Sequence, residues 1–165
     1  LRLMGANLEL LNPREVGGEP VADIRVRSAK LKGIRIPEEL VPLAIDEFPV
    51  LFVAASCAEG ETILTGAEEL RVKESDRIQV MADGLSACGI QAQPTPDGII
   101  IQGGQLTGGT ITSHNDHRIA MSFSIAGLCA NSPMLINDCA TVNTSFPGFV
   151  QLAQQAGLGI STDGE

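Results

Sequence analysis

The pattern of apolar and polar positions predicts strands in the first 36 residues and helices alternating with strands after them. Ala22–Arg27 alternates apolar and charged side chains, which is typical of a strand with one exposed face. Residues 8–13 and 31–36 predict two more short strands, each ended by a proline. Pro37–Leu40 predicts a short helical turn, because proline and acidic residues are favoured at helix starts.

Two nearly all-apolar helices are expected at 46–58 and 116–130. Each opens on an aspartate, Asp46 or Asp116, that can cap its helix. A helix that is apolar all round is buried, so these two helices are the expected core. A third helix, 76–88, has apolar residues on one face only.

The order of elements repeats with a period of about 70 residues, which indicates an internal duplication. In each copy a buried helix is followed by a strand, at 61–65 or 132–137, and then by a second helix. Ile90–Gln102 predicts a hairpin around a Pro-Asp-Gly turn. The sequence therefore predicts an α/β (α+β) fold of helix–strand–helix–hairpin units around buried helices.

The expected division of the chain is one domain, 1–165, with units at 37–105 and 107–165. Strands within residues 1–36 would belong to an earlier unit, so the domain is expected to be incomplete.

Composition excludes several classes of protein. A net charge of −9 leaves no basic stripe for nucleic acid, and the absence of Trp and Tyr removes base-stacking platforms. No apolar run is long enough for a membrane helix. No metal-ligand spacing is present, and the four cysteines form no Cys-x-x-Cys pair, so they are expected to be reduced core thiols of a cytoplasmic protein.

Positive charge is concentrated in two places in the second part of the chain. Arg71–Arg77 and Arg118 hold every lysine and arginine that follows Arg35. Lys73, Arg77 and Arg118 all lie at or near expected helix starts, and helix N-termini attract anions. We therefore expect a phosphate or carboxylate site where these helix starts converge.

Acidic groups beside these cations are candidates for proton transfer. Asp46 could act as a general base on a hydroxyl group, and the Glu74 carboxyl group could carry a proton. The alternatives are structural: Arg71–Arg77 can be a solvated helix start with pairs three and four residues apart, and Asp46 can be only a cap. His117 can be structural, and His114 is expected in a loop. The residues alone indicate an anion-binding α/β domain.

Four motifs together resemble 5-enolpyruvylshikimate-3-phosphate synthases. They are Asp46-Glu-Phe-Pro, Arg71-Val-Lys-Glu-Ser-Asp-Arg77, Asn115-Asp-His-Arg118 and Thr144-Ser-Phe-Pro-Gly-Phe, in the order that the family has. The family joins phosphoenolpyruvate to the 5-hydroxyl of shikimate 3-phosphate and releases phosphate, without metal or organic cofactor. Its two domains are inside-out α/β barrels of three similar units, and this chain would hold the last two units of the C-terminal domain.

The resemblance implies a role for each candidate residue. Asp46 would take the proton from the attacking hydroxyl, and Glu74 would donate a proton to the phosphoenolpyruvate methylene carbon. Lys73 would contact shikimate 3-phosphate; Arg77 and Arg118 would bind the phosphoenolpyruvate carboxylate and phosphate. His117 would line the site, while Arg71 and Asp76 remain as scaffold.

The chain departs from the family pattern at two positions and in its extent. Thr144 stands where many members have lysine, and Glu69 where many have asparagine. The family's N-terminal domain has its own ligands and is absent from this sequence, so the chain alone is expected to be inactive. Two alternatives remain: a free-standing small-anion binding module, and the related enolpyruvyl transferase that acts on UDP-N-acetylglucosamine.

Overall fold

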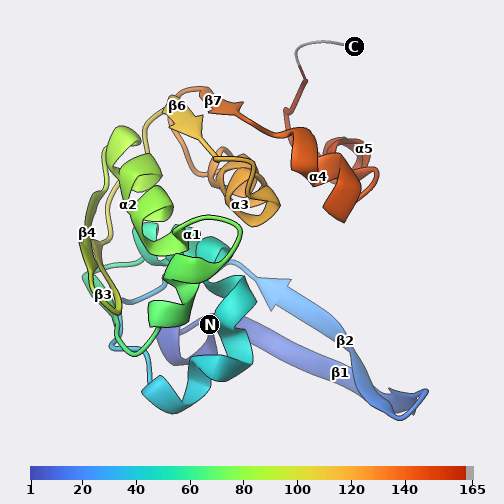
Figure 1. Cartoon of the computed structure of the whole chain (residues 1–165). Helices are drawn as coiled ribbons and strands as arrows, with labels where there is room; N and C mark the ends of the chain where they lie inside the picture. The colour runs from blue at the N-terminus through green and yellow to red at the C-terminus, as the bar shows by residue number, and fades with distance from the viewer. Residues whose placement is uncertain (163–165) are drawn as a thin grey trace.

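The fold places helices in the centre and short strands outside them (Figure 1). The structure is a computed structural model that describes residues 1–162. Its strands are β1 Asn7–Val16, β2 Glu19–Arg27, β3 Glu61–Leu64, β4 Gln91–Thr95, β5 Gly98–Gln102, β6 Gly109–Thr112 and β7 Met134–Asn137. Its α-helices are α1 Phe48–Ser56, α2 Arg77–Ala87, α3 His117–Ala126, α4 Ala140–Ser145 and α5 Phe149–Gln155.

The predicted hairpin supplies β4 and β5, two strands of a three-stranded sheet with the order β3-β5-β4. β5 pairs antiparallel with both neighbours, and the turn between β4 and β5 lies at Thr95–Gly98. The sheet packs against α1 and α2 through the buried residues Leu64, Ile99 and Ile101. The mixed α/β fold expected from the sequence is therefore confirmed.

The two halves of the chain share one arrangement, in which a helix connects two parallel extended segments. β6 and β7 pair parallel on either side of α3. Lys32 and Arg35 form parallel bridges to Glu59 and Ile63 on either side of α1. The expected strand at 31–36 is thus reduced to two bridges, while the predicted unit boundaries at 37–105 and 107–165 stay predictions.

The core lies where α1, α2 and α3 meet. Phe48, Phe52 and Phe123 are each at most 1% exposed, and α1 packs alongside α3 as the all-apolar pattern predicted. Gly84 of α2 is required for this packing, because a Cβ atom there would overlap the ring of Phe123.

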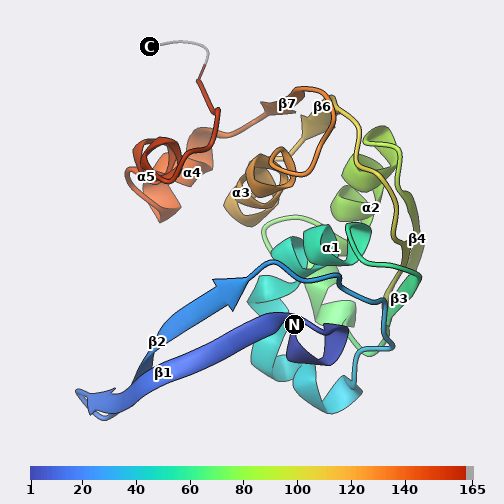
Figure 2. The ribbon, with the colours of Figure 1, turned by 180° about the vertical axis from the view of Figure 1, so that it is seen from behind.

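The hairpin of β1 and β2 projects away from this core (Figures 1 and 2). The sequence predicted a turn at Asn12-Pro13, but the strand continues to Val16 with an irregularity between Leu11 and Arg14. A two-stranded hairpin tolerates proline at such a site, since the missing N–H is not needed by a second neighbour. The reversal comes instead at Gly17-Gly18, whose positive φ angles favour glycine.

Two other expectations were wrong in part. The second helix of the second unit was expected to follow Thr144, but it begins only at Phe149, because Pro147-Gly148 interrupts the helical run. Thr144 itself lies exposed within the separate helix α4. Of the four cysteines, which are all free thiols, only Cys88 is buried in the core.

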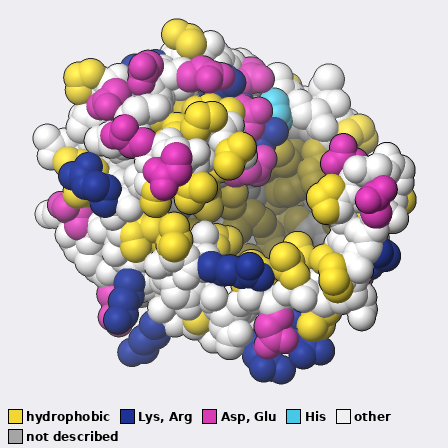
Figure 3. Space-filling view, turned by 90° about the horizontal axis from the view of Figure 1, so that it is seen from below, with side chains coloured by type: hydrophobic (Ala, Val, Ile, Leu, Met, Phe, Trp, Pro, Cys, Tyr) yellow, Lys and Arg dark blue, Asp and Glu magenta, His cyan; other side chains and the backbone are white. Residues whose placement is uncertain are grey.

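The surface seen from below has a deep hollow (Figure 3). Hydrophobic side chains line its floor, and acidic and basic side chains lie along part of its rim (Figure 3). Among the described residues, no helix combines the length and the hydrophobicity that a membrane span needs.

Candidate active site

A buried ion pair between Arg77 and Asp116 lies at the centre of the candidate site. Arg77 is the first residue of α2, and Asp116 is the residue that caps α3. Arg77 Nε donates to Asp116 Oδ2 at 2.9 Å, and the two side chains are 1% and 0% exposed. The pair therefore joins the starts of two helices that belong to different halves of the chain.

Asp116 also accepts hydrogen bonds from groups other than Arg77. Its carboxylate accepts from the backbone N–H of Arg118 at 3.0 Å and from Ser75 Oγ at 2.9 Å. Burial alone would raise the pKa of Asp116, but the Arg77 guanidinium, Ser75 and the Arg118 N–H together lower it. Asp116 is consequently held as a carboxylate inside the protein.

Asp46 faces the same arginine from the opposite side, and the expectation that it caps α1 was wrong. It lies in a 3-10 helix, Pro42–Glu47, that precedes α1, and Pro49 sets the start of α1 without a side-chain cap. Asp46 Oδ1 lies 3.1 Å from Arg77 Nη1 and 3.6 Å from Lys73 Nζ.

The charge on Asp46 is stabilised by the cations around it. Partial desolvation raises the pKa of Asp46, but Lys73, Arg118 and Arg77 together lower it below its usual value. The carboxylate is therefore ionised and able to accept a proton at neutral pH, as a general base must be.

The segment before α2 brings Lys73 and Glu74 to the same place. Glu68–Val72 forms a 3-10 helix fixed by the buried Leu70, and the chain becomes extended at Lys73. Lys73 Nζ donates to Glu69, which raises the pKa of the lysine, and Glu74 Oε2 accepts from Arg77 Nη2 at 2.6 Å. Asp76 accepts from the Gln79 N–H and so caps α2, a role that the sequence analysis did not assign to it.

Arg118 closes the cluster from the first turn of α3. Its Nη1 donates to the backbone oxygen of Asp46 at 2.8 Å and lies 3.3 Å from Glu47 Oε1. His117 is the half-buried first residue of α3, whereas His114 lies exposed in the preceding loop, as expected. Thr144 lies exposed in α4 and, among the described residues, makes no hydrogen bond or ion pair with this cluster.

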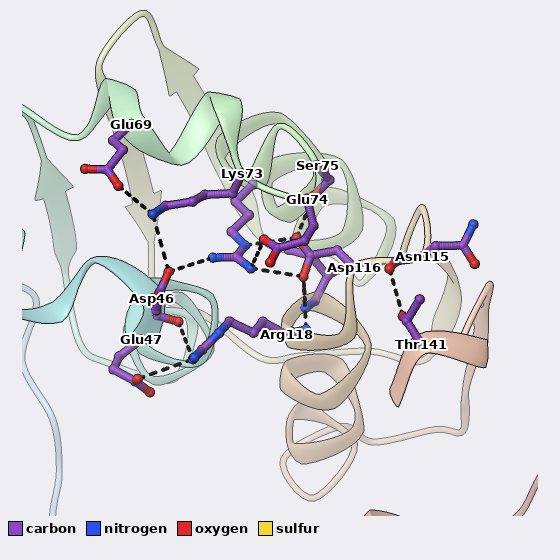
Figure 4. A network of polar contacts seen from close by, with 12 residues as sticks. Asp46, Glu47, Glu69, Lys73, Glu74, Ser75, Asn115, Asp116, Arg118 and Thr141 are labelled. Atoms are coloured by element: carbon purple, nitrogen blue, oxygen red, sulfur yellow. Dashed lines mark hydrogen bonds and ion pairs between the residues drawn. The ribbon is translucent and has the colours of Figure 1, made fainter. Parts of the chain in front are cut away.

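The cluster contains three cations, Lys73, Arg77 and Arg118, and more carboxylates than cations. Its ion pairs connect α2, α3 and the 3-10 helix before α1, so the predicted convergence is confirmed (Figure 4). Within residues 1–162 no group of three or more His, Cys, Asp or Glu side chains could hold a metal ion. The arrangement can bind anionic groups and offers carboxylates for proton transfer.

The sequence analysis missed two contributors to this cluster. Ser75 was treated as part of a charged motif, and Glu47 was not considered. The ion pair between Asp116 and Arg77 was also missed, although Asp116 was recognised as a helix start. The only signal in the sequence was indirect. A buried arginine needs a carboxylate partner, and Asp116 lies one predicted period of about 70 residues after Asp46.

Comparison with known proteins identifies the family. The profile described as EPSP synthase (3-phosphoshikimate 1-carboxyvinyltransferase) matches residues 1–152. The chain is 69% identical over 160 residues to a 3-phosphoshikimate 1-carboxyvinyltransferase of Methylococcus capsulatus, covering 97% of this chain and 37% of that protein. A relative with the same name from Nitrosococcus oceani is 69% identical over 160 residues, covering 97% of this chain and 36% of that protein.

Solved structures agree with the sequence matches. One EPSP synthase structure from Acinetobacter baumannii superposes with a TM-score of 0.92 at 60% identity, over 96% of this chain and 38% of that chain. Another from the same species has a TM-score of 0.93 at 56% identity, over 99% of this chain and 38% of that chain. The chain spans little more than a third of the length of these proteins, and it belongs to the EPSP synthase family, with the α/β enolpyruvyl-transferase fold.

Proposed function

We propose that this chain supplies part of the site that transfers the enolpyruvyl group of phosphoenolpyruvate to the 5-hydroxyl of shikimate 3-phosphate, with release of phosphate. One observation carries the proposal: the five charged residues assigned to this reaction lie in a single network, although they come from three separate segments (Figure 4). They are Asp46, Lys73, Glu74, Arg77 and Arg118.

The chemistry of the substrates fits this network. Both substrates are anions, and an arginine can bind a phosphate or carboxylate group through two parallel hydrogen bonds. Arg118 and Lys73 are partly exposed, at 33% and 22%, and can contact a ligand from opposite sides of Asp46. Arg77 is buried, so it reaches a ligand where one of its exposed partners now lies, and the proposal assigns this place to the position of the Glu74 carboxylate.

The proposal assigns proton transfers to Asp46 and Glu74. Asp46 is ionised beside three cations and takes the proton from the attacking hydroxyl group. Glu74, protonated once it has left Arg77, donates the proton that the methylene carbon receives, and it takes a proton back from the resulting methyl group as phosphate leaves. His117, at the start of α3, lines the same site. No step of this scheme requires a metal ion or an organic cofactor.

The proposal also requires the rest of a longer protein. Relatives are almost three times as long as this chain, and the hollow in Figure 3 leaves a hydrophobic floor in contact with solvent. A surface of that kind is normally covered by another part of a protein or by a partner. We therefore propose that a further domain of the same enzyme completes the site, and that the chain alone releases no phosphate. A cytoplasmic location, expected from the sequence, belongs to this proposal.

A chimera tests the proposal. The matching segment of the Methylococcus capsulatus relative is replaced by this chain, and phosphate release from the two substrates is measured. The chimera should turn over, and Asp46→Asn should lower kcat by about 100-fold or more. Asp83→Asn on the exposed side of α2 is the matched control and should leave kcat unchanged.

Three outcomes would contradict parts of the proposal. A folded chimera that binds both substrates without releasing phosphate would support an anion-binding module instead. Undiminished turnover by Asp46→Asn would remove the assigned base. Robust phosphate release by the isolated chain would contradict the requirement for a second domain.

A further inference from the structure

Arg71 makes three hydrogen bonds that connect the Lys73–Glu74 segment to the turn between β4 and β5. Its Nε donates to the backbone oxygen of Pro96 at 2.8 Å, and its Nη2 donates to that of Thr95. The remaining nitrogen, Nη1, donates to Asp76 Oδ2 at 2.6 Å. One guanidinium group therefore holds two carbonyl groups of the turn and the carboxylate that caps α2.

The same turn also holds the beginning of this segment. Asp97 Oδ2 accepts from the N–H of Gly66 at 2.9 Å, and the backbone oxygen of Asp97 accepts from the N–H of Ala67 at 2.7 Å. Residues 66–76 are thus attached to the β4–β5 turn at their start through Asp97 and at their end through Arg71 and Asp76.

Lys73 and Glu74 lie between Arg71 and Asp76, the two residues that attach the end of this segment. The backbone at Lys73 and Glu74 has no regular secondary structure of its own. The 3-10 helix ends at Val72, and α2 begins only at Arg77. Neither residue is fixed by burial of its own backbone segment in the core, since Val72 is 80% exposed. The path of the backbone at Lys73 and Glu74 therefore depends on the attachments on either side, while the two side chains also contact Glu69 and Arg77.

We propose that Arg71 is a positioning residue that orients Lys73 and Glu74 for the reaction, because it fixes the residues on either side of them, Arg71 itself and Asp76, to the β4–β5 turn. The inference rests on the proposed function, because it assigns to Arg71 an effect on residues that function uses. Only arginine can make this set of contacts, since its rigid planar group offers donors in three directions, whereas lysine carries a single point charge.

Substitution of Arg71 in the chimera described above tests the inference. Arg71→Ala removes all three hydrogen bonds, and a displacement of about 1 Å in catalytic groups can lower a rate about 100-fold. We expect that loss mainly in kcat, with circular dichroism unchanged. Arg71→Lys keeps a charge near Asp76 but loses the paired carbonyl contacts, and should recover only part of the loss.

A matched control separates positioning from stability. Ile99→Val truncates a buried β5 side chain beside the same turn and lowers stability without removing any hydrogen bond between the turn and residues 66–76. It should leave kcat within about twofold of the parent, since no catalytic group moves. If Ile99→Val and Arg71→Ala lower kcat equally, Arg71 acts through stability alone and the inference is overturned.

Hydrogen exchange gives a readout that does not depend on turnover. Arg71→Ala should accelerate exchange at the backbone N–H groups of residues 72–76, and Ile99→Val should not. This measurement decides the inference even if the parent chimera releases no phosphate, an outcome that would refute the proposed function separately. Unchanged exchange at residues 72–76 in Arg71→Ala would overturn the positioning role.

Discussion

Replacing Asp116 by asparagine should destabilise the chain strongly, because Asp116 is the buried anion that neutralises Arg77. Removing one partner of a buried pair costs about 3–5 kcal/mol, since the other charge remains buried. The lower end applies here, because Arg77 keeps Asp46 at 3.1 Å and Glu74 at 2.6 Å. Asparagine also keeps an oxygen that can cap α3. We therefore expect a loss of about 3 kcal/mol.

Urea unfolding followed by far-ultraviolet circular dichroism measures this loss, and the method suits a chain without Trp or Tyr. With a slope of about 2 kcal/mol per molar urea, the midpoint should fall by about 1.5 M. The thermal midpoint should fall by about 6–12 °C.

Two controls make this prediction decisive. Asp116→Ala removes the helix cap as well and should cost about 1 kcal/mol more than asparagine. Asp83→Asn, an exposed aspartate on α2, should change stability by less than about 0.5 kcal/mol. A midpoint for Asp116→Asn within about 0.5 M of the parent, which is about a third of the expected shift, would show that Arg77 does not depend on Asp116 in the folded chain.

Three further predictions follow from the same contacts. The lowered pKa of Asp116 contributes stability that is fully present above the unfolded pKa of about 3.9 and is lost as pH falls through the folded pKa. The difference in urea midpoint between the parent and Asp116→Asn should therefore narrow below about pH 4. A difference that stays constant with pH would contradict this prediction. Gly84→Ala should cost about 1–3 kcal/mol in the same assay because its Cβ would overlap Phe123, and an unchanged midpoint would show that α2 and α3 can move apart. Arg118→Ala in the chimera should raise the KM for phosphoenolpyruvate by about tenfold or more, since a charged hydrogen bond is worth about 1.5–3 kcal/mol; an unchanged KM would remove Arg118 from the ligand site.

Local signals accounted for the parts of the fold that were predicted correctly. Asp76 and Asp116 were recognised as helix starts because a capping residue and the following N–H groups lie within three positions of each other. The hairpin at Gln91–Gln102 was recognised because its turn residues and strands are adjacent in the sequence. Such interactions are decided by neighbouring residues and can be read without knowledge of the fold.

The parts of the site that were predicted wrongly or missed depend on contacts between distant residues. Asp46 has the composition of a helix cap, but its carboxylate pairs with Arg77, which is 31 positions away. Asp116 pairs with Arg77 across 39 positions. The energy of such a pair appears only when packing brings the two helix starts together, so no local pattern distinguishes a cap from an ion-pair partner.

The same geometry determines how the cluster can exchange its internal ion pairs for a ligand. Without a ligand, every one of its three cations has a carboxylate within 3.6 Å, so an anion cannot simply add to free positive charge. The partners differ in how readily they leave: Glu47, Glu69 and Glu74 are 60%, 61% and 52% exposed, and exposed ion pairs contribute little to stability. Asp116 is 0% exposed and cannot move into water. Bound anions would therefore replace the exposed glutamates, while the buried pair with Asp116 keeps Arg77 in place. The carboxylate that Arg77 releases is that of Glu74, to which the proposal assigns the donation of a proton.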